Sequence, residues 1–227
     1  MAAAFDWEAG LKEVNSTVRT AGERLNQMLA KAGLEPLAFP VIGAVDQYVS
    51  LLLRWNRRIN LTAIRDEEGI LSRHFVESIA CARALPAGIR TLLDFGSGAG
   101  FPGIPIALCR PEIAVTLAES QGKKAAFLQE AVRVLGLSAQ IYAARAETLP
   151  QTFDCIVLRA VDRMLTATQT AARLVGLNRW LVLMTTSKDL SKLQEAAGGA
   201  FSWSNVSRLP CGDDQVLALG QRVSLQA

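Results

Sequence analysis

The fold is decided by one stretch of the chain, LLDFGSGAGFPG at residues 92–103. An apolar run leads into Gly96, Gly98 and Gly100, and the prolines that follow fall in the first turn of an expected helix. Glycine lets the backbone bend sharply and approach a ligand closely, and a helix N-terminus adds unpaired N–H groups. The stretch therefore predicts a strand, a ligand-binding turn and a helix.

Two kinds of nucleotide-type site compete for this turn. A dinucleotide site has the spacing G-x-G-x-x-G, which rests a pyrophosphate on the helix N-terminus. Here the glycines follow G-x-G-x-G after Asp94, a form that looks like the first motif of Rossmann-like methyltransferases. The third interpretation is a glycine-rich turn without a ligand. The spacing favours the methyltransferase.

From residue 90 onward, short apolar runs alternate with stretches of helical composition. Such runs are typical of strands buried on both faces of a parallel sheet. The expected strands are 91–95, 114–119, 140–144, 153–160 and 180–186, with a hairpin at 203–209 and 215–221. The expected helices are 104–109, 123–135 and 165–177. The pattern predicts an α/β fold with a doubly wound, mostly parallel, seven-stranded sheet.

The first 89 residues are instead expected to form an N-terminal extension and helical cap, with the Rossmann-like core at 90–227. Helices are expected up to about residue 33, over 41–59 and over 67–85. In the segment 41–59 the apolar residues recur every three or four positions. Its polar face is predicted to carry Arg54, Arg57 and Arg58, where guanidiniums could contact phosphates. A merely solvated face is the alternative.

Charged residues are expected to gather at the carboxyl ends of the strands. Glu119 ends the second strand, where an acid can accept hydrogen bonds from both hydroxyls of a ribose; a solvated side chain at a strand end is the alternative. Ala146 and Glu147 follow the third strand, at the place of an adenine ring, and Arg159 ends the fourth. Because ligands of open α/β sheets bind beyond these ends, Asp94, Glu119, Glu147 and Arg159 are expected to converge on one crevice.

Composition describes an ordinary globular protein of 227 residues, half of them hydrophobic, with a net charge of +3 that does not by itself indicate nucleic-acid binding. Four scattered cysteines and one histidine predict neither a disulfide framework nor a metal site. The sequence shows no secretory signal and no membrane-spanning run. These observations favour a cytoplasmic protein with reduced thiols.

Further motifs narrow the interpretation to one family. They are RWNRRINLTAIRD at 54–66, RHFVES at 73–78, ESQGKK at 119–124 and LRA at 158–160. With the glycine turn, they resemble W-N-x-x-x-N-L-T, R-H-x-x-D-S, D-S-x-x-K-[KR] and S-R-A of the bacterial ribosomal RNA small-subunit methyltransferase G family, also called glucose-inhibited division protein B. The resemblance covers about residues 24–220, and the first two motifs are its most specific part.

This resemblance implies a Rossmann-like class I methyltransferase that uses S-adenosylmethionine and releases S-adenosylhomocysteine. The implied substrate is N7 of a guanine in 16S ribosomal RNA, as naked RNA or in the small subunit, and the protein is expected to be a monomer that needs no metal and no membrane. Since N7 has a free lone pair, no catalytic base is expected. The implied cofactor contacts are Gly96, Gly98, Phe101, Glu119, Ala146, Glu147 and Arg159.

The chain departs from the family pattern at a few positions. Glu77 and Glu119 replace the usual aspartates, and Thr185 stands where the family tends to have a lysine, with Lys188 as its possible substitute. Three other functions remain open on the residues alone: a dehydrogenase, a methyltransferase of small molecules, and a non-catalytic RNA-binding protein.

Overall fold

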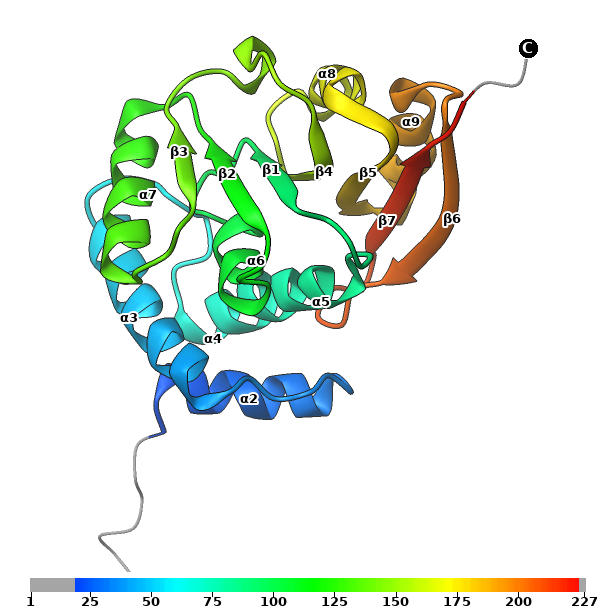
Figure 1. Cartoon of the computed structure of the whole chain (residues 1–227). Helices are drawn as coiled ribbons and strands as arrows, with labels where there is room; N and C mark the ends of the chain where they lie inside the picture. Colours follow the sequence, from blue (N-terminus) through cyan, green and yellow to red (C-terminus); the bar gives the residue numbers. More distant parts are fainter. Residues whose placement is uncertain (1–18, 225–227) are drawn as a thin grey trace, which may run out of the picture.

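The protein is described here by a computed structural model, which covers residues 19–224. A seven-stranded sheet with the order β3-β2-β1-β4-β5-β7-β6 runs through it (Figure 1). Only the pairs that involve β7 are antiparallel. In sheet order the strands are β3 (Gln140–Tyr142), β2 (Ala114–Ala118), β1 (Thr91–Phe95), β4 (Phe153–Arg159), β5 (Val175–Thr186), β7 (Gln215–Arg222) and β6 (Phe201–Arg208).

Helices cover both faces of the sheet. The N-terminal ones are α2 (Ala21–Lys31), α3 (Phe39–Asn56), α4 (Glu67–Gly69), the π-helix η1 (Ile70–Val76) and α5 (Glu77–Ala84). Those of the core are α6 (Gly103–Cys109), α7 (Gly122–Val134), the 3₁₀ turn η2 (Ala146–Thr148), α8 (Met164–Leu174) and α9 (Ser187–Ala197). No helix within residues 19–224 is long and apolar enough to cross a membrane.

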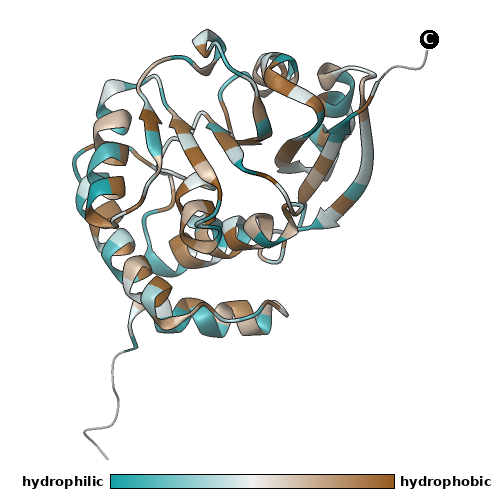
Figure 2. Cartoon of the chain, viewed as in Figure 1, coloured by the Kyte–Doolittle hydropathy of each residue, from teal (hydrophilic) through white to brown (hydrophobic). Residues whose placement is uncertain are grey.

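Two hydrophobic cores result, one on each face of the sheet. Successive residues of a strand point to opposite faces. Leu92 accordingly packs with the N-terminal helices, α6 and α7, whereas Leu93 packs with α8 and α9. Figure 2 shows the hydrophobic residues concentrated in the central strands and hydrophilic ones on the outward turns of the helices. The N-terminal helices thus share one core with the sheet, and the division of the chain at residue 89 stays a prediction.

The sheet order reverses between β1 and β4. After β1 the chain continues to β2 and β3 on one side, and after β4 it continues to β5 on the other side. The loops after β1 and β4 therefore run in opposite directions at the carboxyl edge of the sheet. Open α/β sheets bind their ligands in a crevice at such a point, so the carboxyl ends of β1 and β4 mark the expected ligand site. The predicted α/β class, the mostly parallel seven-stranded sheet and the helical cap are confirmed.

Several predicted boundaries were wrong. The helix expected over 41–59 ends at Asn56, whose side-chain Oδ1 accepts hydrogen bonds from the N–H groups of Leu61 (2.9 Å) and Thr62 (3.1 Å) and turns the chain away. The helix expected to reach residue 177 ends at Leu174, because the chain enters β5 at Val175. Helix α9 was not predicted at all. The N-terminal helix is described only from Ala21, and the part expected before residue 19 lies outside the described residues.

Candidate active site

The turn after β1 adopts the backbone that its glycines predict. Gly96, Gly98 and Gly100 have φ values of +75°, +57° and +87°, a region that side chains rarely adopt. At Gly96 a Cβ atom would lie 3.2 Å from the side chain of Val161, in the loop after β4. The glycine turn therefore lies close to the loop after β4, and a side chain at position 96 would fill the gap between them.

Glu119 ties the ends of β1 and β2 together. One carboxylate oxygen accepts a hydrogen bond from the N–H of Gly98 at 3.0 Å, and the other from the N–H of Gln121 at 2.7 Å. The side chain is buried, so these bonds hold it in one orientation. Because each carboxylate oxygen has two lone pairs, the group can still accept two further hydrogen bonds from a ligand.

Asp94 lies underneath the turn rather than in the crevice. Its Oδ2 accepts a hydrogen bond from the N–H of Gly103 at 2.9 Å, at the start of α6. A Cβ at Gly103 would lie 2.5 Å from the same oxygen, so only glycine fits there. Burial raises the pKa of Asp94 to about 7, against the hydrogen bond from Gly103, which lowers it. Asp94 fixes α6 to β1, and its predicted place among the groups facing the crevice is corrected.

Arg159, at the end of β4, is held by a buried acid of the cap. Its Nη2 donates to Glu77 Oε2 at 2.5 Å and to the carbonyl oxygen of Arg73 at 2.6 Å. Glu77 is only 1% exposed and also pairs with Arg73 Nε at 3.2 Å. Burial raises the pKa of Glu77, and the two guanidiniums oppose this. Arg159 Nη1 is buried without a hydrogen-bond partner, so the site keeps one oriented donor unused.

An aromatic cluster packs the cap against the glycine turn. The Phe101 ring stacks on Tyr48, with centroids 5.3 Å apart, and on His74 at 4.8 Å. Tyr48 Oη donates a hydrogen bond to the carbonyl oxygen of Ala99 within the turn. The ring of Phe101 is thus buried in the interface between cap and core, and its predicted contact with a cofactor stays a prediction. The sequence did not reveal Tyr48, which looks like one more apolar position on α3.

His74 links two segments of the cap. Its Nε2 shares a hydrogen bond of 2.7 Å with Thr62 Oγ1. Burial, together with the nearby charges of Arg159 and Arg73, lowers the pKa of His74 to about 3. The imidazole is therefore neutral and structural. Within residues 19–224, no cluster of three or more His, Cys, Asp or Glu side chains could hold a metal ion.

Ala146 and Glu147 form a short turn after β3. Ala146 is buried, and Glu147 is exposed. The N–H of Glu119 donates to the carbonyl oxygen of Tyr142, the last residue of β3, at 3.0 Å. The turn therefore follows a strand whose end lies beside Glu119. The arrangement places Ala146 and Glu147 on the far side of Glu119 from the glycine turn. Their contact with an adenine ring stays a prediction.

The three arginines predicted to share a helix face do not do so. Arg54 is on α3 and pairs with Glu130 Oε1 of α7 at 2.6 Å, while its side chain is 60% exposed. Arg57 and Arg58 are exposed in the turn after the helix, because α3 ends at Asn56. Nearby Trp55 donates to Glu130 Oε2 at 2.8 Å and packs its ring against Phe127.

Solved structures share this architecture. The pyocyanin biosynthetic protein PhzM aligns with a TM-score of 0.60 at 13% identity, over 89% of this chain and 69% of its own. P. horikoshii TYW2, solved in complex with MeSAdo, aligns with a TM-score of 0.55 at 15% identity, over 66% and 63%. The fold is that of the Rossmann-like class I methyltransferases.

Sequence comparison narrows the class to one family. The model for rRNA small subunit methyltransferase G, GidB, matches residues 42–211, and the chain belongs to this family. A ribosomal RNA small subunit methyltransferase G from Roseiflexus sp. (strain RS-1) is 48% identical over 127 residues, which are 53% of this chain and 54% of that protein. One from Xanthomonas campestris pv. campestris (strain B100) is 46% identical over 121 residues, 52% and 56%. The chain spans about half the length of these curated relatives.

Proposed function

We propose that the protein transfers a methyl group from S-adenosylmethionine to N7 of a guanine in 16S ribosomal RNA. The observation that carries the proposal is Glu119, whose carboxylate is oriented by Gly98 and Gln121 at the carboxyl ends of β1 and β2. Membership of the GidB family supports the ribosomal substrate, and the names of the relatives specify the small subunit.

The described residues fit this cofactor. The glycine turn offers backbone without side chains at Gly96 and Gly98, and Glu119 retains lone pairs for the two ribose hydroxyls. Arg159 Nη1 is an unsatisfied buried donor at the mouth of β4, suited to an acceptor of the ligand. Phe101, Ala146 and Glu147 complete the proposed contacts, with the last two beside the adenine.

The chemistry requires positioning rather than proton transfer. The cofactor supplies an electrophilic methyl group on a sulfonium, and guanine N7 supplies a lone pair that needs no activation. The protein has to hold N7 about 3–3.5 Å from the methyl carbon, in line with the bond that breaks, and exclude water. Neutral His74 is hydrogen-bonded to Thr62, and Arg159 is held by Glu77, so neither is assigned as a base. We assign no catalytic acid or base.

RNA contact is proposed for the exposed arginines at the end of α3. Arg57 and Arg58 form no ion pair within residues 19–224, whereas Arg54 already pairs with Glu130. Guanidiniums suit phosphates because their planar donors can make two parallel hydrogen bonds. The reaction would place the protein in the cytoplasm, with 16S RNA or the small subunit as partner, acting as a monomer without a metal.

The test is transfer of labelled methyl from S-adenosylmethionine to unmodified small-subunit RNA and to subunits, followed by nucleoside analysis. Label in 7-methylguanosine is expected. Gly96→Asp should abolish transfer and S-adenosylhomocysteine binding, since its side chain would meet Val161 and the backbone would be strained. Label in another nucleoside, or undiminished transfer by the Gly96→Asp variant, would contradict the proposal.

A further inference from the structure

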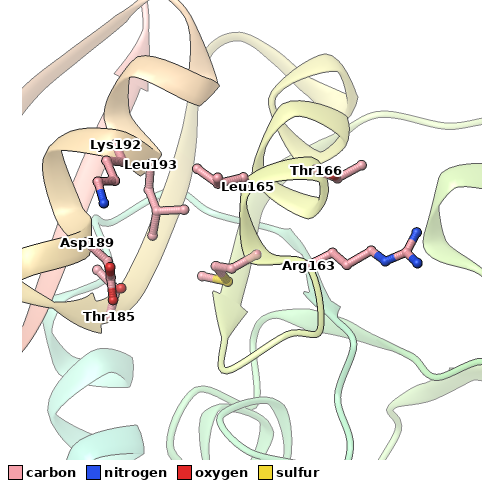
Figure 3. Close-up of a pocket in the computed structure, with 8 residues that line it drawn as sticks. Arg163, Leu165, Thr166, Thr185, Asp189, Lys192 and Leu193 are labelled. Atoms are coloured by element: carbon pink, nitrogen blue, oxygen red, sulfur yellow. The ribbon is translucent and has the colours of Figure 1, made fainter.

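A pocket of about 440 Å³ opens between α8 and α9, beside the crevice. This volume falls within the roughly 300–1,000 Å³ typical of small-molecule sites. Figure 3 shows Leu165 and Leu193 facing each other across it, with Asp189 and Thr185 on the α9 side. Its lining is completed by Arg163, Met164, Thr166 and Lys192.

The pocket lies next to the proposed cofactor site in the sheet. Arg159, at the end of β4, pairs in register with Met184 of β5, and Thr185 of the pocket follows directly. The connecting loop after β4 contains Ala160 and Arg163, both with positive φ, at 48° and 51°. Non-glycine residues in this region are strained, and such strain clusters at functional sites. The loop that faces Gly96 through Val161 thus also contributes Arg163 to the lining of the pocket.

The lining combines apolar walls with one oriented carboxylate. Leu165 is 50% exposed, so its apolar side chain is accessible to a ligand in the pocket. Asp189 is exposed, and its Oδ2 accepts a hydrogen bond from Thr186 Oγ1 at 2.8 Å, whereas its other oxygen has no partner among the described residues. Lys192 also lines the pocket, and its ammonium group forms no ion pair within residues 19–224.

We propose that this pocket receives the target guanine, with Asp189 accepting hydrogen bonds from its N1–H and its 2-amino group. The proposal rests on the proposed function. Of the bases, guanine alone presents two adjacent donors on its Watson–Crick edge, and adenine would set its N1 lone pair against the carboxylate. N7 lies at the opposite end of the purine, so a ring read by Asp189 on α9 turns N7 toward the crevice.

The other lining residues are proposed to contact the faces of the guanine ring and the phosphate. Met164, Leu165 and Leu193 offer apolar surface to the faces of the ring, as in sites that accept a base flipped out of its stack. Lys192 is placed for the phosphate that accompanies the base. In Figure 3 Arg163 extends away from α9, which suits a contact with the neighbouring backbone rather than with the ring.

The test replaces the methylated guanine, once mapped, by inosine, which keeps N7 and N1–H but lacks the 2-amino group. We expect the wild-type protein to prefer guanine by about 10- to 100-fold in kcat/KM, the value of one hydrogen bond to a charged group. Asp189→Ala should lower kcat/KM for guanine and reduce this preference to below about 3-fold, because the contact is gone. Glu195→Ala, an equal charge loss on the exposed face of α9, should leave the preference unchanged.

Asp189 also helps to order the start of α9, so binding of S-adenosylhomocysteine and the thermal midpoint check that the variant is folded. Asp189→Asn keeps an oxygen for Thr186 and should still lose activity toward guanine. If Asp189→Ala keeps the wild-type guanine-to-inosine ratio, the pocket assignment is wrong, although the proposed function stands. If wild-type protein forms no 7-methylguanosine in any ribosomal substrate, the proposed function fails, and the guanine occupant with it.

Discussion

The hydroxyl of Tyr48, on cap helix α3, donates a hydrogen bond to the carbonyl oxygen of Ala99, in the glycine turn of the core. The two residues are 51 positions apart, and Tyr48 is fully buried. Burial and the nearby charge of Asp94 raise the pKa of Tyr48 well above its usual value, so the phenol stays protonated and keeps donating. The shape of the proposed cofactor site therefore depends on a helix outside the Rossmann-like core.

Removing this hydroxyl should loosen the turn. Tyr48→Phe leaves the Ala99 carbonyl buried without a donor, which costs about 1–3 kcal/mol in the free energy of unfolding. Binding of S-adenosylhomocysteine should weaken as well, and both effects are measurable by urea unfolding and calorimetry. Tyr142→Phe removes an exposed hydroxyl bonded to Thr148 and serves as the control. Equal stability of the two variants would contradict the role assigned to Tyr48.

Glu77 should matter to ligand binding through Arg159. Glu77→Gln leaves the buried Arg159 guanidinium without its counter-charge, and loss of one partner of a buried pair is destabilising, by up to about 3–5 kcal/mol. Because Arg159 is then less well oriented, the dissociation constant for S-adenosylhomocysteine should rise. Glu112→Gln, which removes the charge of the more exposed partner of Arg110, is the matched control. Unchanged cofactor affinity in a folded Glu77→Gln protein would refute the positioning role.

His74 predicts a pH dependence of stability. Its pKa is lowered to about 3 in the folded protein, below the usual 6.5, so the unfolded chain takes up a proton that the folded chain does not. Its contribution is therefore present above pH 6.5 and is lost as the pH falls toward 3. Since it is the one histidine of the chain, its imidazole resonance can be followed directly by NMR. The chemical shift should stay constant between pH 8 and about 5, and a midpoint near 6.5 would show that the ring is solvated.

Arg57 and Arg58 should contribute to RNA affinity and not to the cofactor site. The double variant Arg57→Ala, Arg58→Ala is expected to reduce the salt dependence of RNA binding by roughly one unit of slope per arginine, if each neutralises one phosphate. Binding of S-adenosylhomocysteine should not change. Arg54→Ala should have a smaller effect because Arg54 pairs with Glu130. Arg173→Ala, on α8, is the control, and an equal loss with that variant would indicate nonspecific charge effects.

Local sequence was sufficient for the strand–turn–helix unit and for the sheet. The glycine spacing belongs to one contiguous segment, so the turn could be predicted from it. The hydrogen bond from the Gly98 N–H to Glu119 joins two different segments and was not predicted. The position of Asp94 could not be predicted, because its place under the turn depends on the N–H of Gly103 and on burial. The contacts of Phe101 with Tyr48 and His74 join segments far apart in the chain.

One boundary error and one missed helix have equally local causes. The apolar period of α3 continues to Ile59, but the side chain of Asn56 accepts hydrogen bonds from the backbone that follows, and the helix ends there. Arg57 and Arg58 therefore do not lie on the expected helix face. Helix α9 buries only Leu193 and Ala197 and therefore has little apolar pattern. Its start was nevertheless marked by Thr186 followed by Asp189, a capping signal at the correct spacing.

The two outer strands of the sheet have a consequence for the behaviour of the protein in concentrated solution. An open edge invites backbone pairing with another chain, which leads to aggregation. On one side β3 is only three residues long. On the other, the pairing of β6 with β7 shifts register between Ser202 and Asn205. Strand β3 is too short, and β6 is interrupted by its register shift, so neither border offers a strand that is both long and regular for a second molecule to pair with.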